Sequence, residues 1–583
     1  MYAGSDFGFV GDSSQMPMTL QDAQDAINYY VEISSEPRAK EPIALLGAPG
    51  LNQLWTTIAG QARGCWVLPG GTQALIVVAN IAYVVTVTVP ATATSIAQFS
   101  VSQVGTLLTN SGPVSIRDNG VLVNGLGGYA IIVDGTYGYY YLLSGVQQTV
   151  TFTGGVNGTQ TITLASLPNG LIVASTPTLS DSSGYIPGGT TITAVDTNAL
   201  TITMSNFATN TNASDTITLT IPVFGQITDA GFLGAQRVDF IEGWLIFNQP
   251  GTRTFYTTGP TAYQMLFPGA FFALKDSSTD NLVTFQANNR ELWLIGERTS
   301  EVWYGSGLAN FYFSRIPGVG PQIGCSAVAS LTRLGGQLIW LARNEQGENV
   351  VVVSAQYSWD RVSTHAVEHA IAQYDVVSDA IGYAYEEEGH LFYMLTFPTA
   401  DVTWCLDYTT WIRSKGELGW HKRLSFDSGT DTFHRHRSNC FMNFADLRIV
   451  GDYQTGAFHQ MSRQYYTDNG AVLPAVRRSP HVWQKQSRQR VFFAQLQIEF
   501  TPGVGLQSGQ GSNPQAMLRW SDDGGFTWNQ ERWTTIGKVG YTKNRAIWYL
   551  LGEARDRVWE VKITDPVPRD IIGATCYMEA ASG

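Results

Sequence analysis

The sequence has 583 residues, of which 44% are hydrophobic and 14% charged, and its 35 Lys and Arg stand against 47 Asp and Glu for a net charge of −12. This length exceeds one small core, so we expect a repeat-built domain or several domains. The acidic balance argues against a protein whose main task is to grip DNA by neutralising phosphates, but it does not exclude a DNA conduit whose wall does not bind DNA. Five scattered Cys without a Cys-x-x-Cys pair favour buried free thiols, and we expect neither a metal site nor a cofactor.

The first predicted elements are short strands. No basic stretch followed by an apolar run opens the chain, so no signal peptide is expected. The apolar run 74–89 is rich in β-branched residues, which favours buried strands over a membrane helix, and no membrane insertion is expected. With a strand at 63–68 it forms a meander, and residues 1–89 are predicted to hold an N-terminal segment and the first blade of a β-propeller. A strand near Asn28-Tyr29 is the candidate for closing that ring against the far terminus.

The composition changes at about Pro90. From there to about Pro222 the chain consists largely of Thr, Ser, Asn, Gly and Val, with very few charges. Segments such as 149–153 and 216–221 alternate apolar and polar residues too regularly for a disordered region. Residues 90–222 are therefore predicted to be an inserted β-sandwich or barrel domain.

Aromatic strand units recur in the third region, residues 223–583. Each unit consists of a strand, a turn with Gly or Asn, an aromatic strand and a third strand, and the units begin near residues 237, 282, 327, 380 and 441. Their spacing of roughly 45 to 55 residues is typical of propeller blades. The sequence therefore predicts an all-β fold, a propeller of about six blades followed by a C-terminal platform. An elongated stack of β-sandwiches is the structural alternative.

An Asp-box pattern, Ser-x-Asp-x-Gly-x-Thr-Trp, occurs near the C-terminus. It is formed by Ser521, Asp523, Gly525, Thr527 and Trp528. Asp accepts hydrogen bonds from its own backbone and Gly adopts positive φ, so a tight hairpin turn is predicted, as on the outer strands of propeller blades. We interpret these residues as structural, not catalytic.

A lone Asp-box is also found in sialidases, and Arg315-Ile316-Pro317 matches a tripeptide of that class. Such an enzyme needs an arginine cluster, a Tyr paired with Glu and an acid Asp, and no such set stands out. We expect no enzyme and no catalytic residues, and we keep a glycan-binding or sialidase-like propeller as the alternative.

Two basic runs are candidates for contacts with a neighbouring subunit or with DNA in a channel. Arg435 and Arg437 are spaced so that both lie on one face of a strand. The second run supplies the other candidates, Arg477, Arg478, Arg488 and Arg490. A solvated loop is the simpler interpretation of the first run.

Four stretches in a fixed order carry a resemblance to a known family. They are Asn28 to Glu32 with Leu45 to Leu51 and Arg63-Gly64; Gln373 to Phe397 with Thr403-Trp404, Asp407-Tyr408, Trp411 and Gly419 to His421; Tyr465 to Gly470 with Arg477 to Pro480; and Ser521 to Trp528 with Ile536 to Lys538, Leu551 to Arg555 and Asp565-Pro566. In these stretches the chain resembles the tail nozzle, or tail hub, proteins of short-tailed bacteriophages, also described as packaged-DNA stabilisation proteins. The Thr-rich region lies outside the resemblance.

The resemblance implies a structural virion protein in the phage tail, assembled in the host cytoplasm. It implies a homohexameric ring below the portal and the adaptor, the head-to-tail connector. Such a ring retains packaged DNA, lets it pass through the lumen during ejection, and docks tail fibres or tailspikes. The insert 90–222 would then serve as a nozzle tip or an interaction domain. Under the alternative, a glycan-binding or sialidase-like propeller would stand at a phage tail tip.

Overall fold

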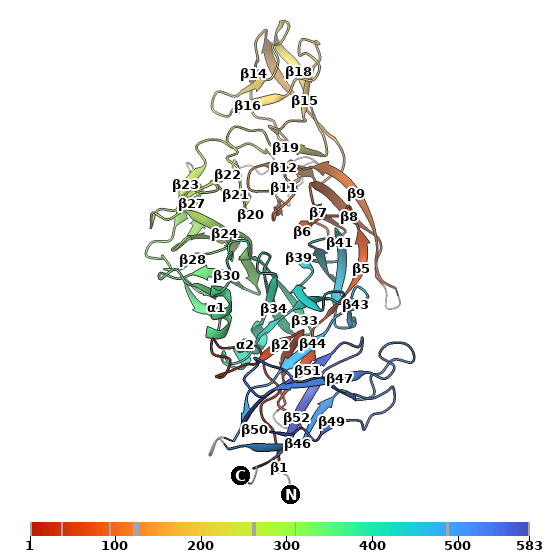
Figure 1. The fold of residues 1–583 in the computed structure, drawn as a ribbon. Helices are drawn as coiled ribbons and strands as arrows, with labels where there is room; N and C mark the ends of the chain where they lie inside the picture. Colours follow the sequence, from red (N-terminus) through yellow and green to blue (C-terminus); the bar gives the residue numbers. More distant parts are fainter. Residues whose placement is uncertain are drawn as a thin grey trace.

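The computed structural model describes residues 3–36, 39–91, 95–119, 128–258, 264–308, 311–484 and 489–580. The molecule is elongated: a ring of sheets occupies the middle, a small β-domain lies at one end, and a β-sandwich lies at the other end together with both termini (Figure 1). The regular structure is almost entirely strand, and the described helices are short, namely α1 (His365–Ala372), α2 (Tyr408–Arg413) and a 3-10 turn (Val328–Ser330). The predicted all-β class is confirmed.

Seven antiparallel units of mostly four strands follow one another around the ring in the described part of the chain. The first four are β6 (Ala62–Val67), β7 (Gln73–Val78), β8 (Ile81–Val89) and β9 (Gln98–Thr106); β10 (Ser115–Asp118), β11 (Tyr129–Val133), β12 (Gly138–Leu142) and β19 (Phe224–Gln226); β20 (Val238–Ile241), β21 (Trp244–Asn248), β22 (Thr254–Thr257) and β23 (Phe272–Leu274); and β24 (Leu282–Asn288), β25 (Glu291–Gly296), β26 (Ser300–Gly305) and β27 (Phe313–Arg315).

The last three units complete the ring. They are β28 (Gly324–Cys325) and β29 (Thr332–Leu334) with β30 (Gln337–Arg343), β31 (Asn349–Ala355) and β32 (Ser358–Arg361); β33 (Ile381–Glu387), β34 (His390–Phe397), β35 (Val402–Asp407) and β36 (Trp420–Lys422); and β39 (Ser438–Phe444), β40 (Leu447–Asp452), β41 (Ala457–Ser462) and β5 (Gly50–Thr56).

The ring is closed by an N-terminal strand. β5 pairs antiparallel with β41, with Gly50 opposite Ser462 and Trp55 opposite Phe458. A Cβ at Gly50 would collide with the carbonyl oxygens of Tyr465 and Thr467, so glycine is required where this strand begins.

The expectation that the strand near Asn28-Tyr29 closes the ring is wrong. β2 (Asp25–Ile27) pairs with β36 and with β44 (Ala475–Arg478), and β3 (Tyr29–Ile33) pairs with β4 (Ile43–Gly47). These N-terminal strands therefore connect the ring to the C-terminal sandwich, and the closing strand follows them in the chain.

The described ring has one more unit than the sequence pattern indicated. The unit of β10, β11, β12 and β19 escaped detection because its fourth strand follows its third only after the strands of the tip. Strand pairing also crosses the expected boundary at residue 90, since β8 pairs with β9. A deletion of 90–222 would thus remove β9 to β12 from two units of the ring.

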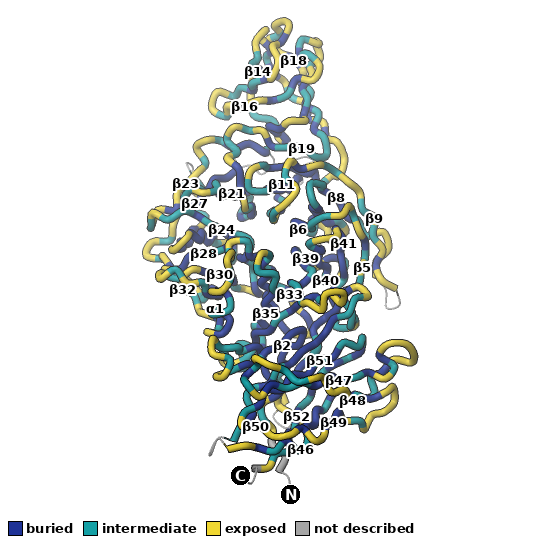
Figure 2. The backbone as a smooth tube through the Cα atoms, viewed as in Figure 1, coloured by how far each residue is buried: buried dark blue, intermediate teal, exposed yellow. Residues whose placement is uncertain are grey.

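Each central strand of the ring is buried on both faces. In β25, Leu292 and Leu294 pack toward the preceding unit, whereas Trp293 and Ile295 pack toward the following one. Successive side chains of a strand point to opposite faces, so a continuous apolar run serves two interfaces at once. Figure 2 shows these inner strands as buried and the loops around them as exposed.

A six-stranded sheet forms the tip of the molecule. Its strands are β13 (Gln148–Asn157), β14 (Thr161–Leu164), β15 (Thr178–Asp181), β16 (Ile192–Asp196), β17 (Thr201–Met204) and β18 (Thr211–Ile221). Along β13 and β18, Thr151 lies opposite Thr218, while Val150 opposite Leu219 faces the core. This core is continuous with side chains from the adjoining ring units, among them Tyr140 and Phe247.

The sandwich at the opposite end consists of two sheets. One contains β1 (Ala3–Ser5), β3, β4, β46 (Val491–Phe500), β49 (Ala546–Tyr549), β50 (Glu553–Ala554) and β52 (Ile571–Ala580). The other contains β44, β45 (Val482–Trp483), β47 (Gln515–Ser521), β48 (Arg532–Thr535) and β51 (Asp556–Ile563), and β2 joins it to β36 of the ring. The short pair β37 (Leu424–Asp427) with β38 (Thr432–Arg435) lies between the last two ring units in the chain. The pair β42 (Thr467–Asp468) with β43 (Ala471–Val472) extends the sheet of the last unit, because β42 also pairs with β5.

Candidate functional site

The Asp-box forms a turn whose hydrogen bonds are satisfied internally. The Asp523 carboxylate accepts from the Ser521 hydroxyl at 2.6 Å and from the Thr527 hydroxyl at 2.6 Å and backbone amide at 2.9 Å. The Ser521 hydroxyl accepts from the Gly525 amide, and the Trp528 indole donates to the Gly525 carbonyl at 3.0 Å. The hydrogen bonds from Ser521 and Thr527 lower the pKa of Asp523 far below its usual range, so this carboxyl stays ionised and cannot serve as a general acid near neutral pH.

The Asp-box hairpin is part of the sandwich and not of a propeller blade, where its sequence pattern had placed it. β47 pairs with β48 and with β51. The neighbouring Asp522 forms a bidentate ion pair with the buried Arg557, at 2.6 and 2.8 Å. The turn is thus anchored to the sandwich core by a charge pair that the motif itself does not contain.

The first candidate arginine pair is used within the chain. Arg435 is buried, and its guanidinium lies 3.7 Å from the ring centroid of Tyr453. Arg437 bridges Asp452 at 2.9 Å and Asp468 at 3.2 Å. Arg435 ends β38 and Arg437 precedes β39, so the two residues do not share the face of one strand.

Arg477 is completely buried and holds the N-terminal segment. Its guanidinium donates to the carbonyl oxygens of Phe9 at 2.7 Å, Asp12 at 2.7 Å and Asp25 at 3.3 Å, and to the side chain of Gln24 at 2.6 Å. In this arrangement Arg477 has no surface with which to contact DNA or another subunit.

The remaining candidates differ in exposure. Arg478 and Arg519 both pair with the buried Glu560, each at 2.5 Å, and Trp528 of the Asp-box covers both guanidinium groups. Arg490 is exposed and pairs with Glu553 at 2.6 Å. Arg488 lies outside the described residues.

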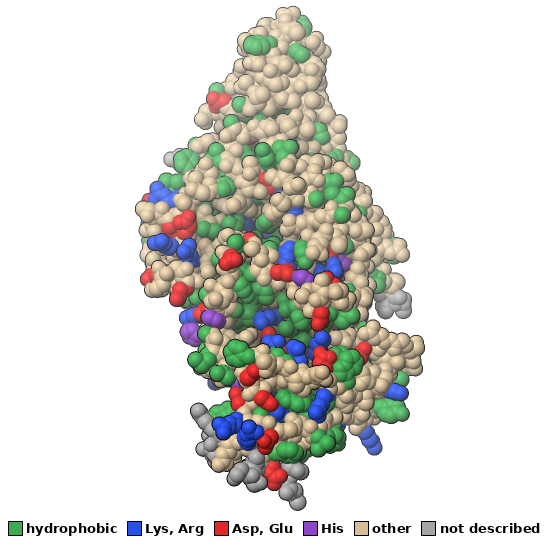
Figure 3. All heavy atoms as spheres, viewed as in Figure 1, with side chains coloured by type: hydrophobic (Ala, Val, Ile, Leu, Met, Phe, Trp, Pro, Cys, Tyr) green, Lys and Arg blue, Asp and Glu red, His purple; other side chains and the backbone are tan. Residues whose placement is uncertain are grey.

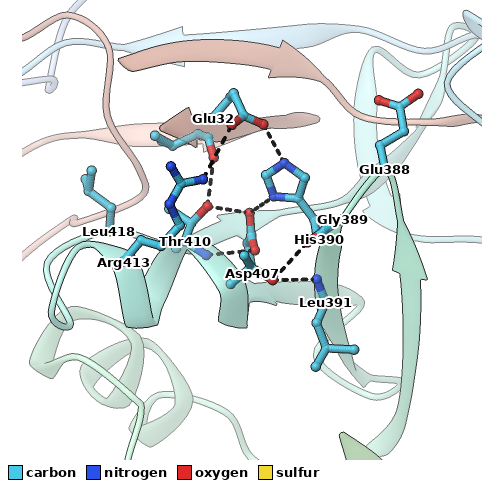
Figure 4. Close-up of polar contacts among 12 residues, drawn as sticks. Glu32, Glu388, Gly389, His390, Leu391, Asp407, Thr410, Arg413 and Leu418 are labelled. Carbon is cyan, nitrogen blue, oxygen red and sulfur yellow. Dashed lines mark hydrogen bonds and ion pairs between the residues drawn. The ribbon is translucent and has the colours of Figure 1, made fainter. Parts of the chain in front are cut away.

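A second polar cluster lies where β3 meets β34, β35 and α2 (Figure 4). The two ring nitrogens of His390 contact Asp407 at 2.6 Å and Glu32 at 2.5 Å. Asp407 is fully buried, caps α2, and accepts a hydrogen bond from the Thr410 hydroxyl at 2.7 Å. Burial lowers the pKa of His390, but the hydrogen bonds and charges of Asp407 and Glu32 outweigh it, so the pKa is raised and the charged form is favoured.

His481 makes a similar contact to the same N-terminal segment. It lies between the Asp556 carboxylate at 2.7 Å and the Thr19 carbonyl oxygen at 2.7 Å. The hydrogen bond to Asp556 raises the pKa of His481 above its usual value, against the effect of burial. Lys422 adds an ion pair with Asp25 at 3.0 Å. We call residues 6–33 the N-terminal strap, because ring residues and sandwich residues both hold it.

A small cavity lies at the centre of the ring, lined by both polar and apolar side chains. Its volume is about 320 Å³, and Arg63, Arg237 and Asp134 are among its lining residues. Arg63 donates to the carbonyl oxygens of Gly112 and Thr109, so its charge is already satisfied. A DNA duplex is wider than its major groove, which alone measures about 12 Å, so it cannot pass through a cavity of this size. A DNA conduit would have to lie outside the ring of a single chain.

The described part of the chain contains no cluster of three or more His, Cys, Asp or Glu side chains arranged to hold a metal ion. None of its helices is long and apolar enough to cross a bilayer. Arg315 of the sialidase-like tripeptide is exposed at the end of β27.

Two family models match the chain. The model described as the β-propeller of bacteriophage P22 Gp10 matches residues 128–466, and the model described as its β-sandwich matches residues 477–579. The chain belongs to the P22 Gp10 family. The resemblance to a phage tail nozzle and packaged-DNA stabilisation protein is thereby confirmed, and so is the all-β fold built on a β-propeller. The β-sandwich of the family is residues 477–579 and not the Thr-rich insert for which a sandwich or barrel was predicted.

The other comparisons add little to the Gp10 assignment. No curated protein matches the chain. Solved structures with similarity include the N-terminal domain of Nup159 (9% identity, 75% of this chain, 98% of the other, TM-score 0.31), the Dos1 propeller (8%, 71%, 95%, 0.31) and PorZ of the Porphyromonas gingivalis type-IX secretion system (10%, 83%, 46%, 0.30). At these TM-scores the likeness carries no inference about function.

The Gp10 propeller and sandwich are joined by residues that the sequence pattern did not single out. The propeller match ends at 466 and the sandwich match begins at 477, and the N-terminal strap contacts both regions. Asp407 could have been recognised as a helix cap from its place before Tyr408. No local signal reveals that Glu32 lies against His390, because 358 positions separate them.

Proposed function

We propose that this Gp10-family tail protein assembles as a homohexameric ring that retains packaged DNA and carries it through its lumen during ejection. The family assignment supports this proposal, because it makes the chain a structural component of the virion tail. The adaptor ring below the portal and the tail fibres or tailspike are the proposed partners, and the host cytoplasm is the proposed place of assembly.

The charge distribution along the molecule supports a conduit. The chain has no Lys or Arg between Arg117 and Arg237, a region that contains the whole tip, but it has six Asp there. A wall without cations does not bind DNA phosphates, so DNA can slide past it. We propose that the tip sheet, residues 148–221, is the distal nozzle, in place of the full insert 90–222.

A non-enzymatic role is part of the proposal. Asp523 is engaged by its own turn, and Asp522 by Arg557, so neither carboxylate is placed to act on a substrate. The alternative is a glycan-binding or sialidase-like propeller at a tail tip, for which the Asp-box and Arg315 are the motivating residues.

Light scattering with negative-stain microscopy of the purified chain tests the proposal. A ring with a mass near six times 63.7 kDa supports it. A protein that stays monomeric at high concentration and cleaves or binds sialosides would overturn it in favour of the alternative. An Arg315→Ala variant is the control, because turnover by a sialidase-like site would fall whereas assembly would not change.

A further inference from the structure

Positive charge is concentrated in the C-terminal part of the sandwich. Residues 477–579 contain 14 Lys and Arg against 10 Asp and Glu, whereas the whole chain has 35 against 47. This segment is therefore cationic within an acidic protein. Several of its arginines are buried or paired with carboxylates, as Arg478, Arg519 and Arg557 are, so only the remaining cations are available at the surface.

One surface of the sandwich combines exposed basic and aromatic side chains. It is formed by β48, β49 and the loop between them, and we call it the β48–β49 patch: Arg532, Trp533, Lys538, Tyr541, Lys543, Arg545 and Tyr549. Trp533, Tyr541 and Tyr549 are 61%, 65% and 59% exposed, far more than a packed aromatic side chain. In Figure 3, a few blue and green side chains are visible at the lower right edge of the molecule, in this region.

Hydrogen bonds between β48, β49 and their connecting loop fix the backbone beneath the patch. Arg532 donates to the carbonyl oxygens of Tyr549 at 3.2 Å and Leu550 at 3.1 Å, and the Trp548 indole donates back to the Arg532 carbonyl oxygen at 2.9 Å. The Asn544 side chain donates to the Thr535 carbonyl oxygen at 2.9 Å across the loop. The exposed side chains therefore project from two strands, one in each sheet of the sandwich, and from the loop between them, which these hydrogen bonds tie together.

The cations of the patch are largely uncompensated. Within the described part of the chain, the ammonium groups of Lys538 and Lys543 form no ion pair with a carboxylate and no other polar contact. Arg545 lies 3.8 Å from Glu499, which also binds Lys40. By contrast, Arg477, Arg478, Arg519 and Arg557 are all engaged inside the sandwich.

Cations interleaved with exposed aromatic rings are the chemistry that recognises nucleic acid: Lys and Arg neutralise phosphates, and the rings stack on bases. We propose that the β48–β49 patch is the surface through which this chain contacts DNA. The inference rests on the proposed function, in which DNA passes the assembled ring. It assigns DNA contact to the sandwich, because the tip lacks cations and the ring cavity is too small.

Anisotropy of fluorescein-labelled 30-mer DNA, duplex and single-stranded, tests the assignment. We expect wild-type binding that weakens steeply with salt, and at least a tenfold loss for Lys538→Glu with Lys543→Glu at low salt. The slope of log K against log salt should fall by about 1 for each lysine removed. Trp533→Ser with Tyr541→Ser should weaken single-stranded DNA more than duplex DNA, because stacking needs an open base face.

A matched control separates the patch from overall charge. Arg298→Glu with Lys415→Glu changes the net charge equally at exposed positions in the ring and beside α2. Unchanged binding by this control, with an unchanged melting temperature for both double variants, supports the assignment. Equal loss in both variants, or no loss in the patch variant, would overturn it.

The assembly state distinguishes failure of the patch assignment from failure of the proposed function. If the wild type forms rings but binds no DNA, the patch assignment fails and the proposed ring stands. If the patch variant binds DNA normally but no longer forms rings, the patch is a contact between copies and the assignment to DNA is wrong. If the wild type forms no rings at all, the proposed function itself fails.

Discussion

In the tip, β13 and β18 place Thr opposite Thr on the outer face and aliphatic side chains on the inner face. In the sandwich, β44 and β51 carry Arg477 and Arg557, which are buried against carbonyl and carboxylate oxygens. The tip sheet is stabilised by β-branched residues and an apolar core alone. The sandwich is stable only if each buried charge is paired or hydrogen-bonded, and several of those partners come from the N-terminal strap. The two ends should therefore respond differently to mutation and pH.

Replacing Arg477 with Ala should have the largest effect. The change leaves buried carbonyl oxygens of Phe9, Asp12 and Asp25 without this donor, and each unsatisfied buried acceptor costs about 1–3 kcal/mol. We expect the sandwich transition in scanning calorimetry to shift markedly downward. Arg490→Ala is the control and should change stability by less than about 0.5 kcal/mol, because its ion pair is exposed. Equal shifts in the two variants would contradict the comparison.

A cavity in the tip should be costly but local. Ile217→Ala removes fully buried methyl groups from the tip core, and such changes typically cost about 2–5 kcal/mol. Amide exchange in β13 and β18 should accelerate while exchange in β46 and β52 stays constant. Thr218→Ala, on the outer face, serves as the control. Acceleration in both ends would show that tip and sandwich unfold together.

Changing Asp523 to Ala should have a smaller effect. The turn loses the acceptor for the Ser521 and Thr527 hydroxyls and the Thr527 amide, so a small fall in the melting temperature is expected. The fluorescence of Trp528 should report local loosening, because its indole is fixed to Gly525 in that turn. Asp523→Asn retains one acceptor oxygen and should lie between Ala and wild type. If the three proteins behave alike, the Asp-box has no structural role.

A rise in pH should loosen the strap and leave the tip unaffected. The pKa values of His390 and His481 are raised, so their stabilisation is complete below pH 6.5 and is lost as pH rises through their folded-state pKa values. Burial also raises the pKa of Asp12 to about 7, so ionising this carboxyl costs more in the folded chain than in the unfolded chain. The contribution of Asp12 to the free energy of unfolding therefore falls as pH rises from 3.8 to about 7. In the tip, the pKa of Asp215 is lowered to about 2, so this carboxyl changes its protonation state only at acid pH.

Hydrogen exchange from pH 6 to 9, corrected for the intrinsic rate, checks this difference. Because the pKa values of both histidines are raised in the folded chain, protection of the strap should fall as pH rises through them. His390→Gln with His481→Gln should abolish most of the dependence. A strap whose protection is constant over this range in the wild type would refute the electrostatic account.

The sequence predicted those features whose contacts lie between residues that are close together in the chain. The Asp-box turn was predicted from eight consecutive residues because its hydrogen bonds close within that stretch. The propeller followed from aromatic strands that pack on two faces, as in β25. One ring unit was missed because β19 returns only after the tip.

The candidate arginines were misjudged for a related reason. Arg477 was expected to contact DNA or a neighbouring subunit because it belongs to a run of basic residues. Its partners at Phe9 and Asp12 lie more than 460 positions away. The cluster of Glu32, His390 and Asp407 was missed on the same ground, since only the folded chain brings its members together.

Because β5 closes the ring, the ring can be completed only late in translation. Gly50 leaves the ribosome about 400 residues before its partner Ser462, which at 5–20 residues per second means a wait of roughly 20–80 s. During that time β5 is an unpaired strand next to a completed first unit, and unpaired strand edges are sites of misassociation. The last propeller unit cannot form until most of the chain has been made. The yield of folded protein in a cell should therefore depend on how well this early segment is shielded while translation proceeds.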